Sequence, residues 1–146
     1  LSLALVAASC GSNKADQQAE DGSDTLAAVY SWEASLNDST GKLEVNKDEL
    51  GGPDTMTAAS VITYLNARNP NVQLTFVKVS GDTLYVSIPD AHYLTQQMGS
   101  SGPQLYFAET VYNLTELTGI KYVNFDLEEG DHAGPETLNR DSFKGE

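Results

Sequence analysis

The chain has 146 residues, and its 21 acidic and 8 basic side chains give it a net charge of −13 at neutral pH. This charge disfavours binding to nucleic acid or to an anionic lipid surface through electrostatic attraction. The chain holds a single cysteine, so it cannot form an intrachain disulfide or a cluster of thiolate ligands for a metal.

The first ten residues form an apolar and small-residue run that ends at Cys10. The run resembles a bacterial lipobox, because small residues flank the cysteine: Ala7, Ala8 and Ser9 before it, and Gly11 and Ser12 after it. The resemblance implies cleavage before Cys10 and lipidation of this residue, and the alternative is a buried or incidental thiol. Signal peptides normally begin with a methionine and a basic segment, so we interpret residues 1–10 as a truncated lipoprotein signal peptide. The run is shorter than the roughly 20 residues that span a bilayer, so acyl chains would supply the membrane anchor.

Residues 11–24 contain no apolar side chain larger than that of alanine. Such a segment buries too little surface to offset the entropy of ordering, so we expect a flexible acidic tether. The first 24 residues hold four acids and one lysine, which leaves a net charge of −10 on residues 25–146. We expect these residues to form one domain with a C-terminal tail.

The first half of this domain predicts a strand, a short extended piece and a helix. In Leu26–Leu36, alternate residues lie on one side of the predicted strand: Ala28, Tyr30, Trp32 and Ala34. A turn over Asn37–Gly41 leads to a short extended piece over Lys42–Val45. Asp54 is the expected cap of a helix that ends at Asn69-Pro70, and its buried face carries Ala58, Ile62 and Leu65.

Two β-rich runs, Val72–Val79 and Thr83–Ile88, predict a hairpin with a turn at Ser80-Gly81-Asp82. The residues expected to face the core are Leu74, Phe76, Leu84, Val86 and Ile88. A short helix follows from Pro89-Asp90, with Leu94 and Met98 on one side, and closes at Gly99.

The strongest local signals lie in residues 103–131. Pro103 suits the first turn of a helix, and the predicted buried stripe carries Phe107, Val111, Leu114 and Thr118, with Leu117 beside it. Glu109 and Glu116 fall on the opposite side. Gly119 supplies the stop, and the next strand buries Val123, Phe125 and Leu127. The sequence therefore predicts an α+β fold, a single two-layer domain with a mostly antiparallel or mixed sheet packed against two or three helices.

Several of these segments together resemble the GerMN domain of spore-germination and sporulation proteins and of bacterial lipoproteins. They are a hairpin ending in TLYVSIP, a short helix with a Gly/Ser loop, a helix of the AETVYNLTELTGI type and the strand KYVNFDLEEG. VYSWEASLN and the helix before the hairpin fit the same order, so the resemblance covers roughly residues 26–130. It implies a compact α/β module, similar to ring-building domains of secretion machinery, whose characterised relatives have no enzymatic activity and act in envelope or assembly complexes. The chain has one copy where some relatives have two, and its tail GDHAGPETLNRDSF departs from the pattern.

One segment offers candidate metal ligands, the acidic turn that ends in Asp131-His132. Carboxylate oxygens there suit a hard cation, but the spacing is neither that of an EF-hand nor that of a zinc helix. We therefore favour a solvated acidic turn, with no metal and no cofactor. Ordinary surface placement is also the favoured interpretation of His92.

The sequence shows no catalytic signature. The Gly99–Gly102 loop is G-S-S-G and follows a helix, whereas a nucleophile elbow is G-x-S-x-G after a strand. Five aromatic residues, Tyr30, Trp32, Tyr85, Tyr106 and Tyr112, could line a groove for a glycan or a protein, although such spacing is more typical of core positions.

Three functions remain open. The favoured one is a lipid-anchored, non-enzymatic interaction or assembly module of the bacterial cell envelope, facing outside the cytoplasm. The second is a lipoprotein that binds cell-wall glycan or another carbohydrate. The third is a metal-dependent hydrolase that uses the turn at Asp131-His132.

Overall fold

The computed structural model describes residues 30–145. The predicted signal peptide with Cys10, the predicted tether over residues 11–24 and the first part of the strand predicted from Leu26 lie outside the described residues.

A two-stranded antiparallel ribbon opens the described chain. Strand β1, Ser31–Leu36, pairs with β2, Leu43–Asp48, so that Trp32 lies opposite Lys47. Between them Gly41 takes a positive φ of 69°, as the predicted turn requires. The second strand extends beyond the predicted Val45, because every residue as far as Asp48 has a partner in β1.

Helix α1, Ala58–Arg68, begins later than predicted. Its cap is Thr57, whose hydroxyl accepts a hydrogen bond from the Ser60 N–H at 3.2 Å. The prediction of Asp54 as the cap was wrong, because the helical backbone starts only after Thr57 and a cap must reach the N–H groups of the first turn. The helix buries Val61, Ile62 and Leu65 and ends at Asn69, as predicted.

The main sheet has four strands in the order β3-β4-β5-β6, namely Thr75–Ser80, Thr83–Ile88, Tyr122–Leu127 and Glu136–Leu138. The predicted hairpin of β3 and β4 is confirmed, with Gly81 at φ 60° in its two-residue turn. Strands β4 and β5 are parallel, because the chain between them crosses the sheet through a helix. The outer pairs are antiparallel, so the sheet is mixed, and the predicted α+β class is confirmed.

The crossover contains two helices. A π-helical turn, η1, spans Tyr93–Gln97, and α2 spans Gly102–Leu114 with Pro103 in its first turn. Helix α2 ends at Leu114 with Thr115 as its cap, four residues before the predicted Thr118, so the prediction that Gly119 stops the helix was wrong. Gly119 takes the expected positive φ, 81°, but in the turns that lead from α2 to β5. None of the helices in residues 30–145 has the combined length and hydropathy of a membrane span.

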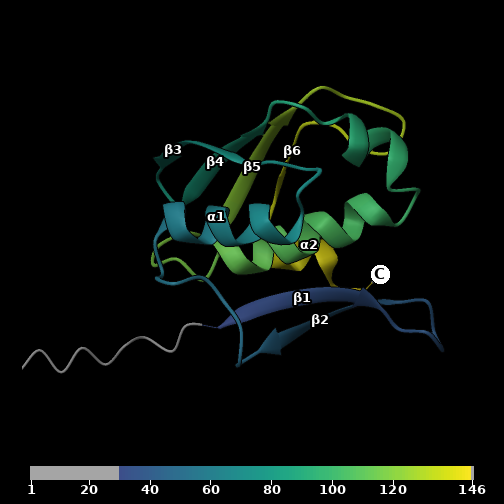
Figure 1. The fold of residues 1–146 in the computed structure, drawn as a ribbon, viewed down its shortest axis with the longest axis horizontal. Coiled ribbons are helices and arrows are strands. Elements are labelled where there is room, and N and C mark those ends of the chain that lie inside the picture. Colours follow the sequence, from purple (N-terminus) through teal and green to yellow (C-terminus); the bar gives the residue numbers. More distant parts are fainter. Residues whose placement is uncertain (1–29, 146) are drawn as a thin grey trace, which may run out of the picture.

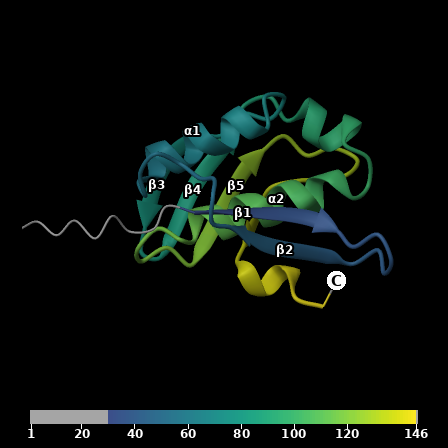
Figure 2. The same ribbon diagram turned by 60° about the horizontal axis from the view of Figure 1, so that its bottom comes forward.

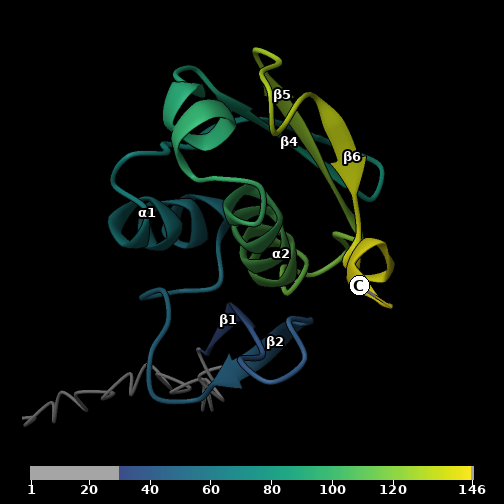
Figure 3. The same ribbon diagram turned by 90° about the vertical axis from the view of Figure 1, so that its right-hand side faces the viewer.

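The elements form three layers, with the helices in the middle (Figure 1). The four-stranded sheet covers one side of α1 and α2, and the β1–β2 ribbon lies against the other side of α2, as the side view also shows (Figure 3). The structure therefore adds a layer to the two that the sequence predicted. The polar side of α2, which carries Glu109 and Asn113, holds the ribbon instead of facing solvent alone.

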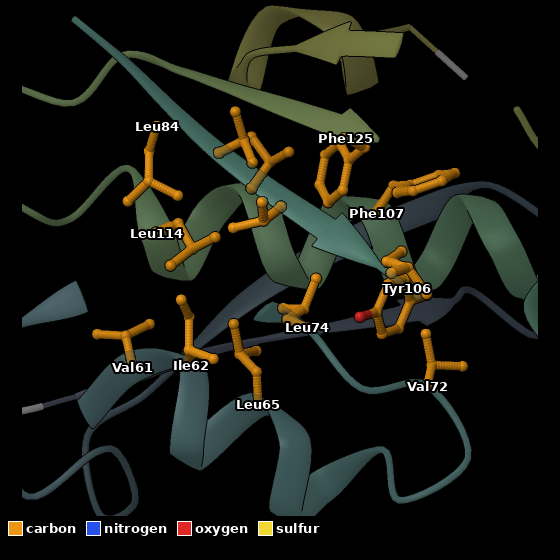
Figure 4. Close-up of a cluster of buried hydrophobic side chains, with 14 of the residues drawn as sticks. Val61, Ile62, Leu65, Val72, Leu74, Leu84, Tyr106, Phe107, Leu114 and Phe125 are labelled. Atoms are coloured by element: carbon orange, nitrogen blue, oxygen red, sulfur yellow. The ribbon is translucent and has the colours of Figure 1, made fainter. Parts of the chain in front are cut away.

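The hydrophobic core lies between the main sheet and the two helices (Figure 4). Most of the predicted core residues of the helices and all of those of β4 and β5 are buried, including Leu84, Phe125 and Leu114. Ala58 and Met98 are half-buried, and the prediction of Thr118 as a buried residue was wrong, because α2 ends at Leu114 and Thr118 lies in the turns that follow it. Phe76 was predicted to be buried and is 46 % exposed, because β3 is an edge strand with a neighbouring strand on one side only.

The C-terminal tail is part of the fold. After β6 it forms a 3-10 helix, η2, over Arg140–Phe143, which packs beside the ribbon and α2 (Figure 2). Asn139 and Ser142 form a reciprocal capping box at its start, and Phe143 is buried.

Candidate binding surface

A polar and aromatic cluster joins β1, the end of α2 and η2. The guanidinium of Arg140 lies over the rings of Trp32 and Tyr112, at 5.1 and 4.8 Å from their centroids. It donates to the Tyr112 carbonyl and the Thr115 hydroxyl at 2.9 Å each, and also to the Glu116 carboxylate. These contacts tie the C-terminal helix to the first strand and to α2.

Glu116 is the centre of this cluster. Its carboxylate accepts hydrogen bonds from Arg140, from the Trp32 indole N–H at 2.9 Å and from the Tyr30 hydroxyl. Burial alone would raise the pKa of Glu116, but the bonds from Arg140, Tyr30 and Trp32 outweigh it and hold this pKa below its ordinary value. The same bond to the carboxylate, with partial burial, raises the pKa of Tyr30. Both oxygens of the Glu116 carboxylate therefore accept hydrogen bonds that hold the fold together.

Helix α2 also covers the free edge of β1. The buried Asn113 amide accepts from the Trp32 N–H and donates to the Trp32 carbonyl, both at 2.9 Å. One turn earlier, the Glu109 carboxylate accepts from the Ala34 N–H at 3.3 Å and from the Arg68 side chain at 3.0 Å. The helix thus makes the hydrogen bonds that a third strand would make, and the edge of β1 is closed.

At the edge of β3, a helix side chain covers only Leu74, the residue just before the strand. The Asn66 amide of α1 accepts from the Leu74 N–H at 2.7 Å and donates to the Leu74 carbonyl at 3.0 Å, the same pattern that Asn113 makes with Trp32. Among the hydrogen bonds of residues 30–145, no side chain bonds to the backbone of Thr75–Ser80.

Strand β3 exposes large apolar side chains along this open edge. Phe76, Val77 and Val79 are 46 %, 52 % and 47 % exposed. Phe76 lies opposite Val86 and Val79 opposite Leu84, and a bulge between Phe76 and Lys78 interrupts the register. We call the open edge and exposed side chains of Thr75–Ser80 the β3 edge.

A hollow of about 460 Å³ lies on the outer face of the sheet, away from the helices. Its lining includes Val77, Tyr85, Asn124, Asp126 and Glu136. The Lys78 ammonium lies 4.8 Å from the centre of the Tyr85 ring, and partial burial raises the pKa of Glu136. An aromatic ring with nearby amide and carboxylate groups can contact the hydroxyls and the apolar face of a sugar.

The acidic turn that offers candidate metal ligands in the sequence does not gather them in the structure. Asp131 and His132 are exposed, and the His132 N–H donates to the Thr95 carbonyl at 3.2 Å. Within the described range, no three His, Cys, Asp or Glu side chains are close enough together to hold a metal ion. These residues therefore offer no ligand set for the metal-dependent hydrolase. His92, predicted as a surface residue, is exposed.

The five candidate groove aromatics do not form one groove. Tyr30, Trp32 and Tyr112 belong to the Glu116 cluster, Tyr85 lines the outer hollow, and Tyr106 is buried in the core. The sequence did not predict Arg140 as a residue of this cluster, because its partners Trp32 and Glu116 come from other parts of the chain. The available signal was Asn139 three residues before Ser142, a spacing that caps a helix.

Comparison of the chain with protein-family models, curated proteins and solved structures finds no match in any of the three.

Proposed function

We propose that the protein is a lipid-anchored, non-enzymatic interaction module of the bacterial cell envelope, attached to the membrane through Cys10. The lipobox-like run that ends at Cys10, the acidic segment that follows it and the resemblance to GerMN domains support this proposal. The GerMN relationship itself is part of the proposal.

The observation that carries the interaction role is the β3 edge. Three apolar side chains in a row of four, Phe76, Val77 and Val79, are about half exposed on one strand. Gathered apolar side chains on a soluble surface mark contact sites, whereas single ones need no explanation. The non-enzymatic part is supported by Glu109 and Glu116, partly buried carboxylates whose oxygens are taken up by structural hydrogen bonds.

The test is crosslinking in cells followed by affinity capture, with the native protein and its Cys10→Ala variant side by side. We expect a reproducible set of envelope proteins with the native protein and loss of that set with Cys10→Ala. Mass spectrometry of the native protein supplies the second readout. An unmodified Cys10, or a mature protein that retains residues 1–9, would refute the lipid anchor.

The outer hollow favours a second candidate function, the binding of a cell-wall glycan. It combines the Tyr85 ring with the Asn124 amide and the Asp126 carboxylate in one concave region. Titration of the protein with soluble peptidoglycan fragments, followed by NMR, should shift the amides of β4 and β5. Asn124→Ala should weaken this response, and Asn71→Ala, which lies outside the hollow, serves as the control. Absence of shifts at millimolar glycan would remove this candidate.

A further inference from the structure

We infer that the β3 edge binds one extended segment of another protein, added as a fifth strand, with a carboxylate of that segment placed against Lys78. This inference rests on the proposed interaction function and specifies the kind of partner.

The backbone of β3 has unpaired hydrogen-bonding groups along its outer edge. An edge strand directs alternate N–H and C=O groups away from its sheet, and these groups serve as a template for another strand. On β1 the corresponding groups bond to Asn113 and Glu109. On β3 this cover stops at Leu74, so the template starts at Thr75.

The side chains of β3 offer an apolar surface to a further strand. Phe76 and Val79 lie opposite the fully buried Val86 and Leu84, so they continue the core face of the sheet at its rim. A strand with apolar residues at alternate positions would cover them and extend the core by one strand. The bulge between Phe76 and Lys78 increases the local twist, which restricts pairing to segments that can follow it.

Charge indicates whether the partner at the β3 edge is another protein or a second copy of this chain. Lys78 is the only charged residue of β3 and lies near its middle. Antiparallel pairing of two β3 strands in the register centred on Lys78 would place two Lys78 side chains opposite each other. In every register the two chains, each with a net charge of −13, would also repel each other. A partner strand with a carboxylate opposite Lys78 replaces this repulsion with attraction. The geometry therefore favours a different protein.

The experiment uses two capped peptides, Ser-Thr-Val-Glu-Val-Thr-Ser and the same sequence with Lys in place of Glu. Each is titrated to millimolar concentration into isotope-labelled full-length Cys10→Ala protein, and amide shifts are followed by NMR. We expect shifts concentrated in Thr75–Ser80, with at least a fivefold weaker response to the lysine peptide. No shifts in β3 with either peptide would overturn the inference, and equal responses would overturn the role of Lys78.

A charge reversal provides the matched control. Lys78→Glu should reverse the preference, so that the lysine peptide binds better than the glutamate peptide. Lys121→Glu makes the same charge change at an exposed position just before β5 and should leave the preference unchanged. A concentration-dependent dimer of the unmodified domain, lost in Lys78→Glu or unaffected by the peptides, would identify a second copy as the occupant and overturn the inference.

Capture in cells separates this inference from the proposed function. Envelope partners that remain with Lys78→Glu and Phe76→Ala, but disappear with Cys10→Ala, would overturn the β3 inference and leave the proposed function in place. If the native protein captures no partner, the proposed function fails, and the peptide titration still decides whether β3 accepts a strand.

Discussion

Strands β1 and β3 both lie at the edge of a sheet. Helix side chains form hydrogen bonds to the backbone of β1 but not to that of β3. On β1 the Trp32 backbone bonds to Asn113 on both its N–H and its carbonyl, and the Ala34 N–H bonds to Glu109. On the β3 side, Asn66 makes the same pair of bonds to Leu74, and the six residues of the strand receive none.

The edge of β1 is covered and that of β3 is open because the two strands are stabilised by different contacts. A two-stranded ribbon alone is marginally stable in water, so β1 and β2 depend on α2 for further hydrogen bonds and apolar contacts. Strand β3 belongs to a four-stranded sheet with a core of its own and does not need a cover. An open edge can therefore persist at β3, where it is available to a partner, and not at β1.

Asn113→Ala tests the cover of the β1 edge and has the largest expected effect on stability. The change removes the buried Asn113 amide and leaves the N–H and carbonyl of Trp32 without their partner, and each such group costs about 1–3 kcal/mol. We expect the free energy of unfolding to fall by about 3 kcal/mol in urea. The fluorescence of Trp32, the single tryptophan, reports on the ribbon directly.

Asn66→Ala is the matched control, since it removes the same two bonds from Leu74 at a position that is only partly buried. Water can replace part of that bonding, so we expect a loss of about 1 kcal/mol. Equal losses for the two variants would contradict the idea that α2 is essential to the ribbon and α1 dispensable to β3.

The second prediction concerns Arg140→Met, which retains an apolar stem and removes the charge. It leaves Glu116 without its cationic partner and Trp32 without the stacked guanidinium, so we expect a loss of about 2 kcal/mol. Thermal unfolding with Trp32 fluorescence measures it. Lys144→Met removes the exposed ion pair with Asp141 and should change nothing measurable. An unchanged melting temperature for Arg140→Met would show that the tail does not hold the ribbon.

The third prediction uses pH. The pKa of Glu116 lies below its ordinary 4.5 in the folded state, so its ionisation stabilises the fold above about that pH and the contribution is lost on acidification. The difference in unfolding free energy between the native protein and Glu116→Gln should be about 1–2 kcal/mol at pH 7 and should shrink below pH 4.5. A difference that grows on acidification would contradict the assigned direction.

Sequence patterns predicted the elements whose stability is local. The turn with Gly81, the positive φ of Gly119 and the alternation of Val123, Phe125 and Leu127 each depend on neighbours a few residues away, and all are present in the structure. The α+β class follows from the order of these elements.

What the sequence could not predict depends on contacts between distant segments. The side of the predicted helix with Glu109 and Glu116 has the pattern of a solvent-exposed face, and only the position of β1, more than 70 residues away, gives these two residues a role. Phe76 fits the alternation of a buried strand, but burial also requires a neighbour on both sides, and no sequence pattern of β3 reveals that it lies at an edge. Arg140 was missed for the same reason, because its partners Trp32 and Glu116 come from other parts of the chain.

The smallest expected effect is that of Phe76→Ala, and it tests the open edge directly. Phe76 and Val86 are opposite each other in neighbouring strands, yet Phe76 is 46 % exposed and Val86 fully buried. Val86→Ala should therefore lower the free energy of unfolding by about 2–3 kcal/mol, and Phe76→Ala by less than about 1 kcal/mol, although it removes the larger side chain. Urea unfolding at low protein concentration measures both. A loss of 3 kcal/mol or more for Phe76→Ala would mean that another chain or segment already covers β3 in solution, and the comparison of a closed β1 edge with an open β3 edge would no longer hold.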